Sequence, residues 1–302
     1  MSSVDRWYAP DKVYDAHCHF FGHSFFNRIA KQRGFNSPEE LIRNWQFRGG
    51  KIELPPKDSK ALAEMWAKEA EKNNVDKIVL LPEFNDLTDI RVATREYPDI
   101  FIPFLSIDPT KSEAREILEQ GISEIGVKGI KLYPPLHYFH AYEDRVRPIY
   151  EIAQENDLLV TFHFGVSVGS TADMRFMNPS DLSPVALEFP KVKFALAHFG
   201  TGYFRELLFL MYHYKNIYAE TSSSNVWMKY LPYELTLQDV FGKVIEVAGV
   251  DHIIFGTDSS FFPRGWRRAI FEWQLAVVND LRLSQEEINA IFYKNLERIL
   301  KL

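Results

Sequence analysis

The feature that most constrains the fold of this chain is a repeated unit of roughly 30 residues, in which a short apolar run precedes a stretch with helical periodicity. Eight apolar runs recur, at residues 13–17, 77–81, 100–105, 127–132, 158–163, 192–198, 216–220 and 253–258. Amphipathic stretches separate them, at residues 59–73, 86–96, 111–121, 142–156, 180–188, 201–212, 236–249 and 266–280. Continuous apolar runs of this length are typical of strands buried on both faces of a parallel sheet. We therefore predict eight β-α units with right-handed crossovers.

Eight such units in 302 residues predict one (β/α)8 TIM barrel domain spanning residues 1–302. An open, doubly wound α/β sheet shows the same alternation, and the pattern alone does not exclude it. The last segment, residues 284–302, begins with a capping box of Ser284 and Glu287, so we expect an extra C-terminal helix. The insertion at residues 20–58 is far longer than an ordinary connection. Its aromatic side chains, which include Trp45 and Phe47, favour a compact lid or an oligomer contact over disorder.

Composition narrows the classes of partner. The formal net charge is −6, whereas nucleic-acid binding usually requires a basic surface. No apolar run approaches the roughly 18 residues that a membrane span needs, and the N-terminus lacks the apolar region of a signal peptide. The single cysteine cannot form an intrachain disulfide, which favours a reducing compartment. We therefore expect a cytoplasmic homodimer that acts on a small molecule, without nucleic-acid or membrane partners.

Five polar side chains end predicted apolar strands: His17, His19, His163, His198 and Asp258. The carboxyl ends of all barrel strands meet at one mouth, so these side chains should converge there. His17 and His19 share a strand face, whereas Cys18 points the other way as a buried filler. A single buried histidine is more simply a hydrogen-bonded core residue, but this set would be costly to bury without a metal or a network. Imidazoles with a carboxylate favour zinc, and manganese or iron accept similar ligands.

Lys131 shares one face of the fourth predicted strand with Val127 and Gly129. If that face is the barrel interior, the buried ammonium must lose its charge, pair or be modified. A lysine carboxylated by carbon dioxide would bridge two metals. The alternative is a lysine that pairs with a carboxylate such as Glu220 or contacts an anionic substrate, and both interpretations stay open. Asp15, two residues before His17 on the same predicted face, would either orient a ligand or cap backbone groups at the strand start.

These residues resemble the amidohydrolase superfamily, and the resemblance covers almost the whole chain. Asp15-Ala16-His17-Cys18-His19 is similar to its first-strand signature, and His163, His198 and Asp258 match its fifth-, sixth- and eighth-strand positions. Residues 129–134 and 295–300 resemble the amidohydrolase-2 branch, which includes aminocarboxymuconate-semialdehyde decarboxylase and other TIM-barrel metal-dependent hydrolases.

The resemblance implies a divalent metal, and two arrangements of it. In the first, His17, His19, His163 and Asp258 hold one ion, and His198 acts beside it as acid or base. In the second, carboxylated Lys131 bridges two ions, one on His17, His19 and Asp258 and the other on His163 and His198. We favour a single ion, most simply zinc, with manganese or iron as alternatives.

The expected chemistry is metal-dependent hydrolysis of a C–O or C–N bond in a small, carboxylated cyclic or aromatic substrate. A metal-activated water would attack, Asp258 would act as general base, and His198 would stabilise the oxyanion. The alternative is nonoxidative decarboxylation of an aromatic or muconate-type acid at the same site, and a third interpretation is a metal-stabilised barrel with a binding role. We expect Arg264 to hold a substrate carboxylate, and Arg267 and Arg268 to be solvated at a helix start. Tyr133 and His137 are further candidate substrate contacts.

Overall fold

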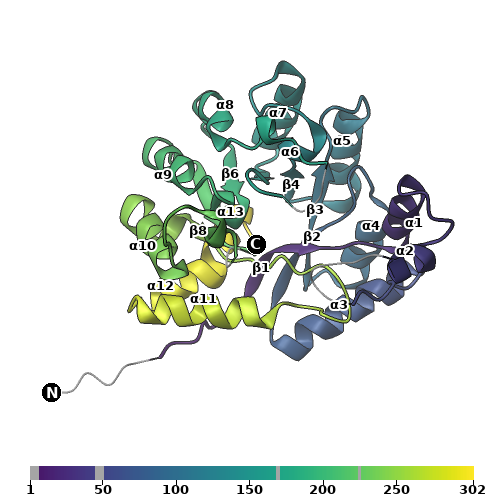
Figure 1. Ribbon diagram of the computed structural model, residues 1–302, viewed down its shortest axis with the longest axis horizontal. Helices are drawn as coiled ribbons and strands as arrows, with labels where there is room; N and C mark the ends of the chain where they lie inside the picture. Colours follow the sequence, from purple (N-terminus) through teal and green to yellow (C-terminus); the bar gives the residue numbers. More distant parts are fainter. Residues whose placement is uncertain (1–6, 45–50, 168–170, 224–225) are drawn as a thin grey trace.

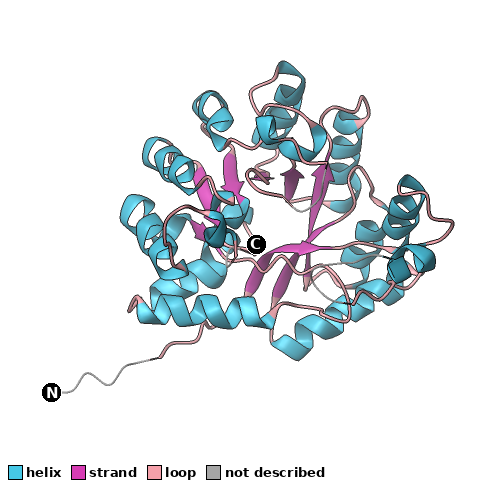
Figure 2. Cartoon of the chain, in the orientation of Figure 1, coloured by secondary structure: helices cyan, strands magenta, loops and turns pink. Residues whose placement is uncertain are grey.

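Eight parallel strands form the centre of the protein, and helices surround them (Figures 1 and 2). The computed structural model describes residues 7–44, 51–167, 171–223 and 226–302. The strands are β1 (Tyr14–His19), β2 (Lys77–Leu81), β3 (Phe101–Ile107), β4 (Gly129–Leu132), β5 (Leu159–Phe162), β6 (Lys193–Leu196), β7 (Ile217–Glu220) and β8 (Ile253–Ile254). They pair in sequence order, β1 to β8. Each predicted apolar run overlaps one strand, and the predicted (β/α)8 barrel is confirmed.

The seam between β8 and β1 is closed mainly by backbone hydrogen bonds beyond the short strand β8. These are Ala16 N to Phe255 O at 3.0 Å, Asp258 N to His17 O at 2.9 Å and His19 N to Ser259 O at 2.7 Å. The prediction that the eighth strand continues to Asp258 is wrong, because β8 ends at Ile254. Asp258 has a φ of 61°, a left-handed conformation that a strand cannot contain.

Helices follow the strands in the predicted alternation. They are α1 (His23–Gln32), α2 (Pro38–Asn44), α3 (Ser59–Asn73), α4 (Thr88–Glu96), α5 (Ala114–Ile125), α6 (Pro134–His137), α7 (Arg147–Glu155), α8 (Leu182–Glu188), α9 (Phe204–His213), α10 (Leu237–Ala248), α11 (Arg268–Asp280), α12 (Gln285–Asn289) and α13 (Asn295–Leu300). Local signals define several ends. Asp58 caps the first turn of α3 by accepting from Lys60 N, and Thr236 forms a capping box with Asp239 at the start of α10.

The core has two layers, one between strands and helices and one inside the barrel. The inner layer includes Tyr14, Ala16 and Phe104. A Cβ at Gly129 would lie 2.4 Å from the Phe104 ring and 2.6 Å from Leu159 O, so only glycine leaves room for this ring. Gly129 therefore faces the interior, and Lys131, two residues later on the same face of β4, lies one level nearer the mouth.

The C-terminal segment closes the end of the barrel opposite the mouth. The predicted capping box of Ser284 and Glu287 starts α12, and a π-helical turn at Ala290–Lys294 leads into α13. Tyr293 packs edge-on against Tyr14 at the start of β1, with ring centroids 5.6 Å apart. Asn295 Nδ2 donates to Ile253 O at 2.9 Å, at the start of β8. This floor leaves the mouth as the end where polar side chains of several strands gather.

The insertion at residues 20–58 is compact within its described part and packs beside the mouth. Helices α1 and α2 share a small core of Phe26, Ala30, Leu41 and Ile52, to which Phe261 of the loop after β8 also packs. Glu53 N donates to Phe262 O at 2.7 Å and attaches the insertion to the same loop. The predicted aromatic contacts Trp45 and Phe47 lie outside the described residues. Separately, no helix in the described ranges has the length and apolar character needed to cross a membrane.

Candidate metal centre and active site

A β-bulge in β1 sets the direction of the His17-Cys18-His19 motif. The pairing register with β2 shifts between Asp15 and Cys18. Tyr14 and Ala16 belong to the inner core layer, whereas Cys18 belongs to the outer one, so the bulge reverses the alternation of side chains along the strand. The prediction that Cys18 is a buried bystander on the outer face is confirmed. His17 and His19 therefore share the inner face, with ring centroids 5.1 Å apart.

The same bulge corrects the expectation that Asp15 lies on the face of His17. Asp15 Oδ2 accepts from Trp266 Nε1 at 2.7 Å and from the Thr257 hydroxyl, and Asp15 Oδ1 accepts from the backbone N–H groups of His17 and Thr257. The carboxylate thus caps backbone groups and anchors the loop after β8, and it does not contact a histidine ring. Burial raises the pKa of Asp15 to about 7, against the opposing effect of these hydrogen bonds.

The His17 ring is held by a buried carboxylate at the end of β7. Its Nδ1 lies 2.8 Å from Glu220 Oε2 and 3.0 Å from Ser222 Oγ. Glu220 also accepts from Ser222 N at 2.6 Å, and a Cβ at Gly256 would lie only 2.3 Å from Glu220 Oε1. Glycine at 256 therefore makes space for this carboxylate. With Nδ1 protonated and bound to Glu220, Nε2 of His17 presents a lone pair, and it is buried without a hydrogen-bond partner in the described chain.

Two further histidines face each other across the mouth. His198 Nδ1 lies 2.7 Å from Ser222 O, and His163 Nε2 lies 3.3 Å from Val166 O. A carbonyl oxygen only accepts, so each of these nitrogens carries the proton. The inner nitrogens, His198 Nε2 and His163 Nδ1, then meet at 3.0 Å with lone pairs toward each other. Burial lowers the pKa of His198 to about 4 and holds the pKa of His163 well below its usual value, so neither ring readily supplies a proton for this contact.

Asp258 lies at the centre of these imidazoles. Its Oδ1 is 3.2 Å from His19 Nε2 and 3.6 Å from His17 Nε2. Burial favours the neutral acid, but the hydrogen bond from His19 and the charge of His198 hold the pKa of Asp258 well below its usual range. The carboxylate is therefore ionised, and its left-handed backbone is the kind of strained conformation that concentrates at functional sites.

The donor atoms fit a divalent cation. Ligand atoms of His17, His198 and Asp258 lie within 4.8 Å of one another, and the chain could hold a metal there. The orphaned Nε2 of His17 and the facing lone pairs of His163 and His198 are the groups a cation would satisfy. His19 lies beside this group and contacts Asp258, and His163 lies beside it and contacts His198. The structure thus brings all five predicted residues together, with His198 inside the tightest group.

Lys131 is buried in the barrel, as its strand face predicted. Its Nζ has no hydrogen-bond partner in the described chain, and no ion pair joins it to Glu220. The interpretation as a lysine paired with Glu220 is therefore not what the structure shows, because Glu220 is already held by His17 and Ser222. Burial lowers the pKa of Lys131 to about 8, against the opposing charges of Glu220 and Asp258. An ammonium in this position still lacks an anionic partner.

The predicted substrate contacts lie at different depths. The Tyr133 ring packs at a tilt of 34° against His163 with centroids 4.1 Å apart, and its hydroxyl hydrogen-bonds to Ser167. His137 packs edge-on against Phe84, at 4.3 Å between centroids. Arg264 is exposed and donates to Ser260 Oγ at 2.6 Å.

Arg267 is the site residue that the sequence analysis missed. It was expected to be solvated, but its side chain is only 20 % exposed and its Nη1 lies 3.7 Å from Asp258 Oδ2. The sequence signal that could have identified Arg267 is its place at the end of the loop that follows Asp258. Helix α11 begins only at Arg268, so the loop can return toward the mouth at Arg267. Arg268, by contrast, is exposed as predicted and pairs with Glu272.

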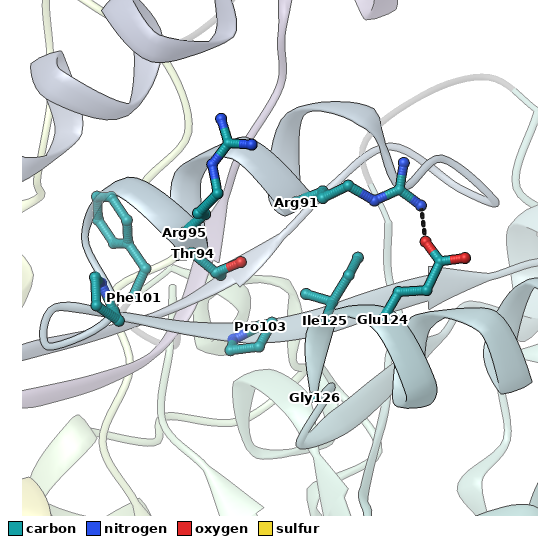
Figure 3. Close-up of a pocket in the computed structure, with 9 residues that line it drawn as sticks. Arg91, Thr94, Arg95, Phe101, Pro103, Glu124, Ile125 and Gly126 are labelled. Carbon is teal, nitrogen blue, oxygen red and sulfur yellow. Dashed lines mark hydrogen bonds and ion pairs between the residues drawn. The ribbon is translucent and has the colours of Figure 1, made fainter.

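A hollow of about 450 Å³ lies elsewhere, between α4 and α5 near the starts of β3 and β4 (Figure 3). Arg91 points to Glu124 there and donates to it at 2.5 Å. Among the described residues that line it, none carries a buried polar atom without a partner. The chemistry-bearing side chains therefore gather at the mouth and not in this hollow.

Comparisons with known proteins agree with this fold. A TIM-barrel protein from Bordetella bronchiseptica, described as uncharacterised, is 21% identical and has a TM-score of 0.68, with 96% of this chain and 98% of that chain covered. The manganese-bound 5-carboxyvanillate decarboxylase of Novosphingobium aromaticivorans is 14% identical, with a TM-score of 0.66 over 100% of this chain and 98% of that chain.

A probable 2-pyrone-4,6-dicarboxylic acid hydrolase from Acinetobacter baumannii is 13% identical, with a TM-score of 0.64 over 96% of this chain and 100% of that chain. These likenesses show the fold. A comparison with curated protein sequences finds no match. The family model described as amidohydrolase matches residues 14–302, and the chain therefore belongs to the amidohydrolase-2 family.

Proposed function

We propose that the protein is a metal-dependent hydrolase that cleaves a C–O or C–N bond in a small, carboxylated cyclic or aromatic substrate. The observation that carries this proposal is the position of Asp258. One ionised carboxylate contacts His17 and His19 through Oδ1 and faces Arg267 through Oδ2. A proton acceptor therefore lies among the candidate metal ligands and next to a cation that can hold an anionic substrate.

His17, His19, His163 and Asp258 would hold a single ion in our preferred arrangement, with zinc as the first choice and manganese or iron as alternatives. A divalent metal there would polarise a substrate carbonyl and acidify water. A second ion would require Lys131 to be carboxylated. The buried Nζ of Lys131 has no hydrogen-bond partner among the described residues, which indicates that an anionic group is missing beside it. That group is either a carboxylate formed on the lysine itself or the carboxylate of a bound substrate.

The side chains of the mouth would do the rest of the chemistry. Asp258 takes a proton from the attacking water and passes it to the leaving group, a role open to it because its carboxylate is ionised in the free site. His198, whose Nδ1 proton is committed to Ser222 O, keeps its Nε2 directed into the site. The proton can travel from Asp258 to the leaving group by way of this nitrogen, and while His198 carries it, Nε2–H would donate to the developing oxyanion. Tyr133, packed against His163, would form one wall of the substrate site.

Nonoxidative decarboxylation of an aromatic or muconate-type acid is the second candidate. The observation that favours it is the pair of cations, Lys131 and Arg267, in a site that already contains candidate metal ligands. Such a site would bind a carboxylate that leaves as carbon dioxide, while water, directly or through Asp258, delivers a proton to the carbon that loses it. The manganese-bound 5-carboxyvanillate decarboxylase that shares the fold supports including this reaction in the tests.

Product analysis separates the two reactions. Protein loaded with Zn²⁺ or Mn²⁺ would be screened against lactones, esters, amides and aromatic acids, in water enriched in ¹⁸O. Hydrolysis places one ¹⁸O atom in the product without gas release, and this is the expected result. Carbon dioxide release without incorporation of ¹⁸O would replace the hydrolase proposal with the decarboxylase. Elemental analysis of the same protein gives the number of ions per chain, and two tightly held ions would contradict the single-ion arrangement.

A further inference from the structure

Arg267, just before α11, is a cation that the structure fixes in place at the mouth. Its Nη1 lies 3.1 Å from both Ser223 Oγ and Thr257 O, to which it donates. These two contacts join the ends of β7 and β8 to the guanidinium. The same nitrogen is 3.7 Å from Asp258 Oδ2, which is close enough for an ion pair but too long for a hydrogen bond. Asp258 therefore does not use up the hydrogen-bonding capacity of Arg267.

The donors of Arg267 are only partly used. A guanidinium has five N–H groups, and the two on Nη1 suffice for Ser223 and Thr257. In the described parts of the chain, Nε and Nη2 of Arg267 have no hydrogen-bond acceptor. Nε–H and one Nη2–H form the parallel pair of donors that binds a carboxylate bidentately. The structure thus holds one edge of the guanidinium and leaves the edge suited to a carboxylate open.

The neighbouring arginines are placed differently. Arg264 is exposed and reaches Ser260 on its own loop, and Arg268 is paired with Glu272 one turn along α11. Neither contacts Asp258 within ion-pair distance. Arg267 is therefore the arginine whose position is set relative to the candidate reaction centre.

The balance of charge at the mouth also calls for an anion. Asp258 and Glu220 supply two carboxylates, and Glu220 is engaged by His17 and Ser222. Lys131 and Arg267 supply two cations, and a divalent metal would add two positive charges. The Lys131 ammonium has no partner in the described residues. A buried excess of positive charge is costly unless an anion neutralises it, and a substrate carboxylate is the anion that Arg267 is shaped to bind.

We propose that Arg267 binds a substrate carboxylate directly beside the reacting atom, so that the preferred substrates are small acids whose carboxylate lies one or two bonds from the bond that changes. The short distance between Arg267 Nη1 and Asp258 Oδ2 sets this limit, because an anion on Arg267 cannot be far from the general base. The inference rests on the proposed function for the position of the reaction centre, and it assigns to Arg267 the role that the sequence suggested for Arg264.

The test compares a carboxylate with its uncharged isostere. Binding of benzoate and of benzamide to the Mn²⁺-loaded protein would be measured by calorimetry at fixed ionic strength. Native protein should prefer benzoate, and Arg267→Gln should weaken benzoate binding by about 10- to 100-fold while leaving benzamide binding within about twofold. The matched control is Arg268→Gln, which removes the adjacent charge and should leave both affinities unchanged. Arg267→Lys keeps the charge without the planar pair of donors and should show an intermediate loss.

Three results would overturn the assignment. One is a native protein without preference for benzoate, another is an Arg267→Gln variant that keeps the preference, and the third is its loss in Arg264→Gln alone. If circular dichroism shows that Arg267→Gln does not fold, the comparison of benzoate with benzamide binding is made with Arg267→Lys instead. The proposed function fails separately, when the metal-loaded protein turns over no hydrolysable substrate. An Arg267-dependent preference for benzoate in such a protein would leave the carboxylate site standing while removing the hydrolase.

Discussion

Asp258 combines a position among the candidate metal ligands with a charge that a neutral isostere cannot supply. Asparagine at 258 keeps the size of the side chain and tolerates the left-handed φ of 61°, so the variant should fold. It lacks the basicity needed to accept a proton. We expect Asp258→Asn to lower kcat by more than about 10³-fold on any substrate found for the native protein. Steady-state kinetics measures the loss of kcat, and a thermal melt checks that the variant is folded. Near-native turnover would show that Asp258 is not the general base.

Glu220 acts through His17 and is a positioning residue. Its carboxylate accepts from His17 Nδ1, from Ser222 N and from Ser222 Oγ. In Glu220→Gln, one of the two carboxylate oxygens is replaced by an NH2 group, which then faces a donor instead of accepting from it. Loss of such a partner typically costs about 10- to 100-fold in metal affinity, which is the effect we expect on Mn²⁺ or Zn²⁺ binding by competition with a chelating dye. Glu246→Gln, at an exposed position on α10, is the control. Equal affinities in the two variants would show that His17 needs no support.

His137 links the pH dependence of stability to the loop after β4. Its side chain is 11 % exposed, and burial lowers its pKa from 6.5 to about 4, against the opposing charge of Asp108. Between pH 6.5 and 4 the unfolded chain therefore binds a proton at His137 that the folded chain does not. Stability should fall as the pH drops through this window, by on the order of 1–3 kcal/mol from this group.

His137→Gln removes that contribution. Urea unfolding of metal-free protein at several pH values should show the native and variant stabilities diverging above pH 4 and becoming parallel above pH 6.5. A difference that does not vary with pH would mean that His137 titrates normally in the folded protein.

At the level of elements, the apolar runs predict every strand because strands covered on both faces consist mainly of apolar side chains, and the few polar ones lie chiefly toward the mouth. The same reasoning places His163 and His198 at the mouth, where they are found. The same reasoning assigns Asp15 to the wrong face of β1. A β-bulge depends on how β1 pairs with β2, and the alternation of Tyr14, Asp15 and Ala16 in the sequence does not reveal it.

The sequence also does not predict the path of the loop after β8. Arg264, Arg267 and Arg268 are alike as residues, and only the path of the loop decides which one meets Asp258. That path depends on distant contacts. Asp15 binds Trp266 Nε1, and Glu69 of α3 accepts from Trp266 N at 3.2 Å. A Cβ at Gly265 would lie 2.5 Å from Glu69 Oε1, so the close approach requires glycine.

The insertion between β1 and α3 should respond to mutation as a unit of its own. Phe26 is 1 % exposed at the centre of its small core, where it also packs against Phe261 with centroids 5.8 Å apart. Phe26→Ala should cost about 3–5 kcal/mol within this core. Since few apolar contacts hold α1 and α2, we expect faster amide hydrogen exchange at residues 23–44 with little change in β2 to β7. Asn27→Ala, at an exposed neighbouring position, is the control. Uniformly faster exchange throughout the barrel would show that the insertion is part of one cooperative unit.

The whole molecule is a barrel with one floor and one reactive end. The C-terminal segment covers the starts of β1 and β8, while the insertion and the loop after β8 pack together beside the mouth. Candidate ligands come from β1 and from the ends of β5, β6 and β8. They meet close to the seam where β8 and β1 are joined by loop hydrogen bonds rather than by a long ladder. A cation bound there would hold together elements that are otherwise weakly connected.

This arrangement predicts that metal stabilises the whole fold. An ion that binds only the folded chain adds about 2.7 kcal/mol at a free concentration 100 times its Kd. In a protein of this size each kcal/mol shifts the Tm by roughly 2–4 °C, so chelator-treated protein should melt roughly 5–10 °C higher after Zn²⁺ or Mn²⁺ is restored. Scanning calorimetry measures this directly. Asp258→Asn removes one central ligand and should lose most of the shift, since the remaining donors hold the ion less tightly. An equal shift in native protein and variant would place the bound metal away from the mouth, and no shift in native protein would show that the cluster holds no ion.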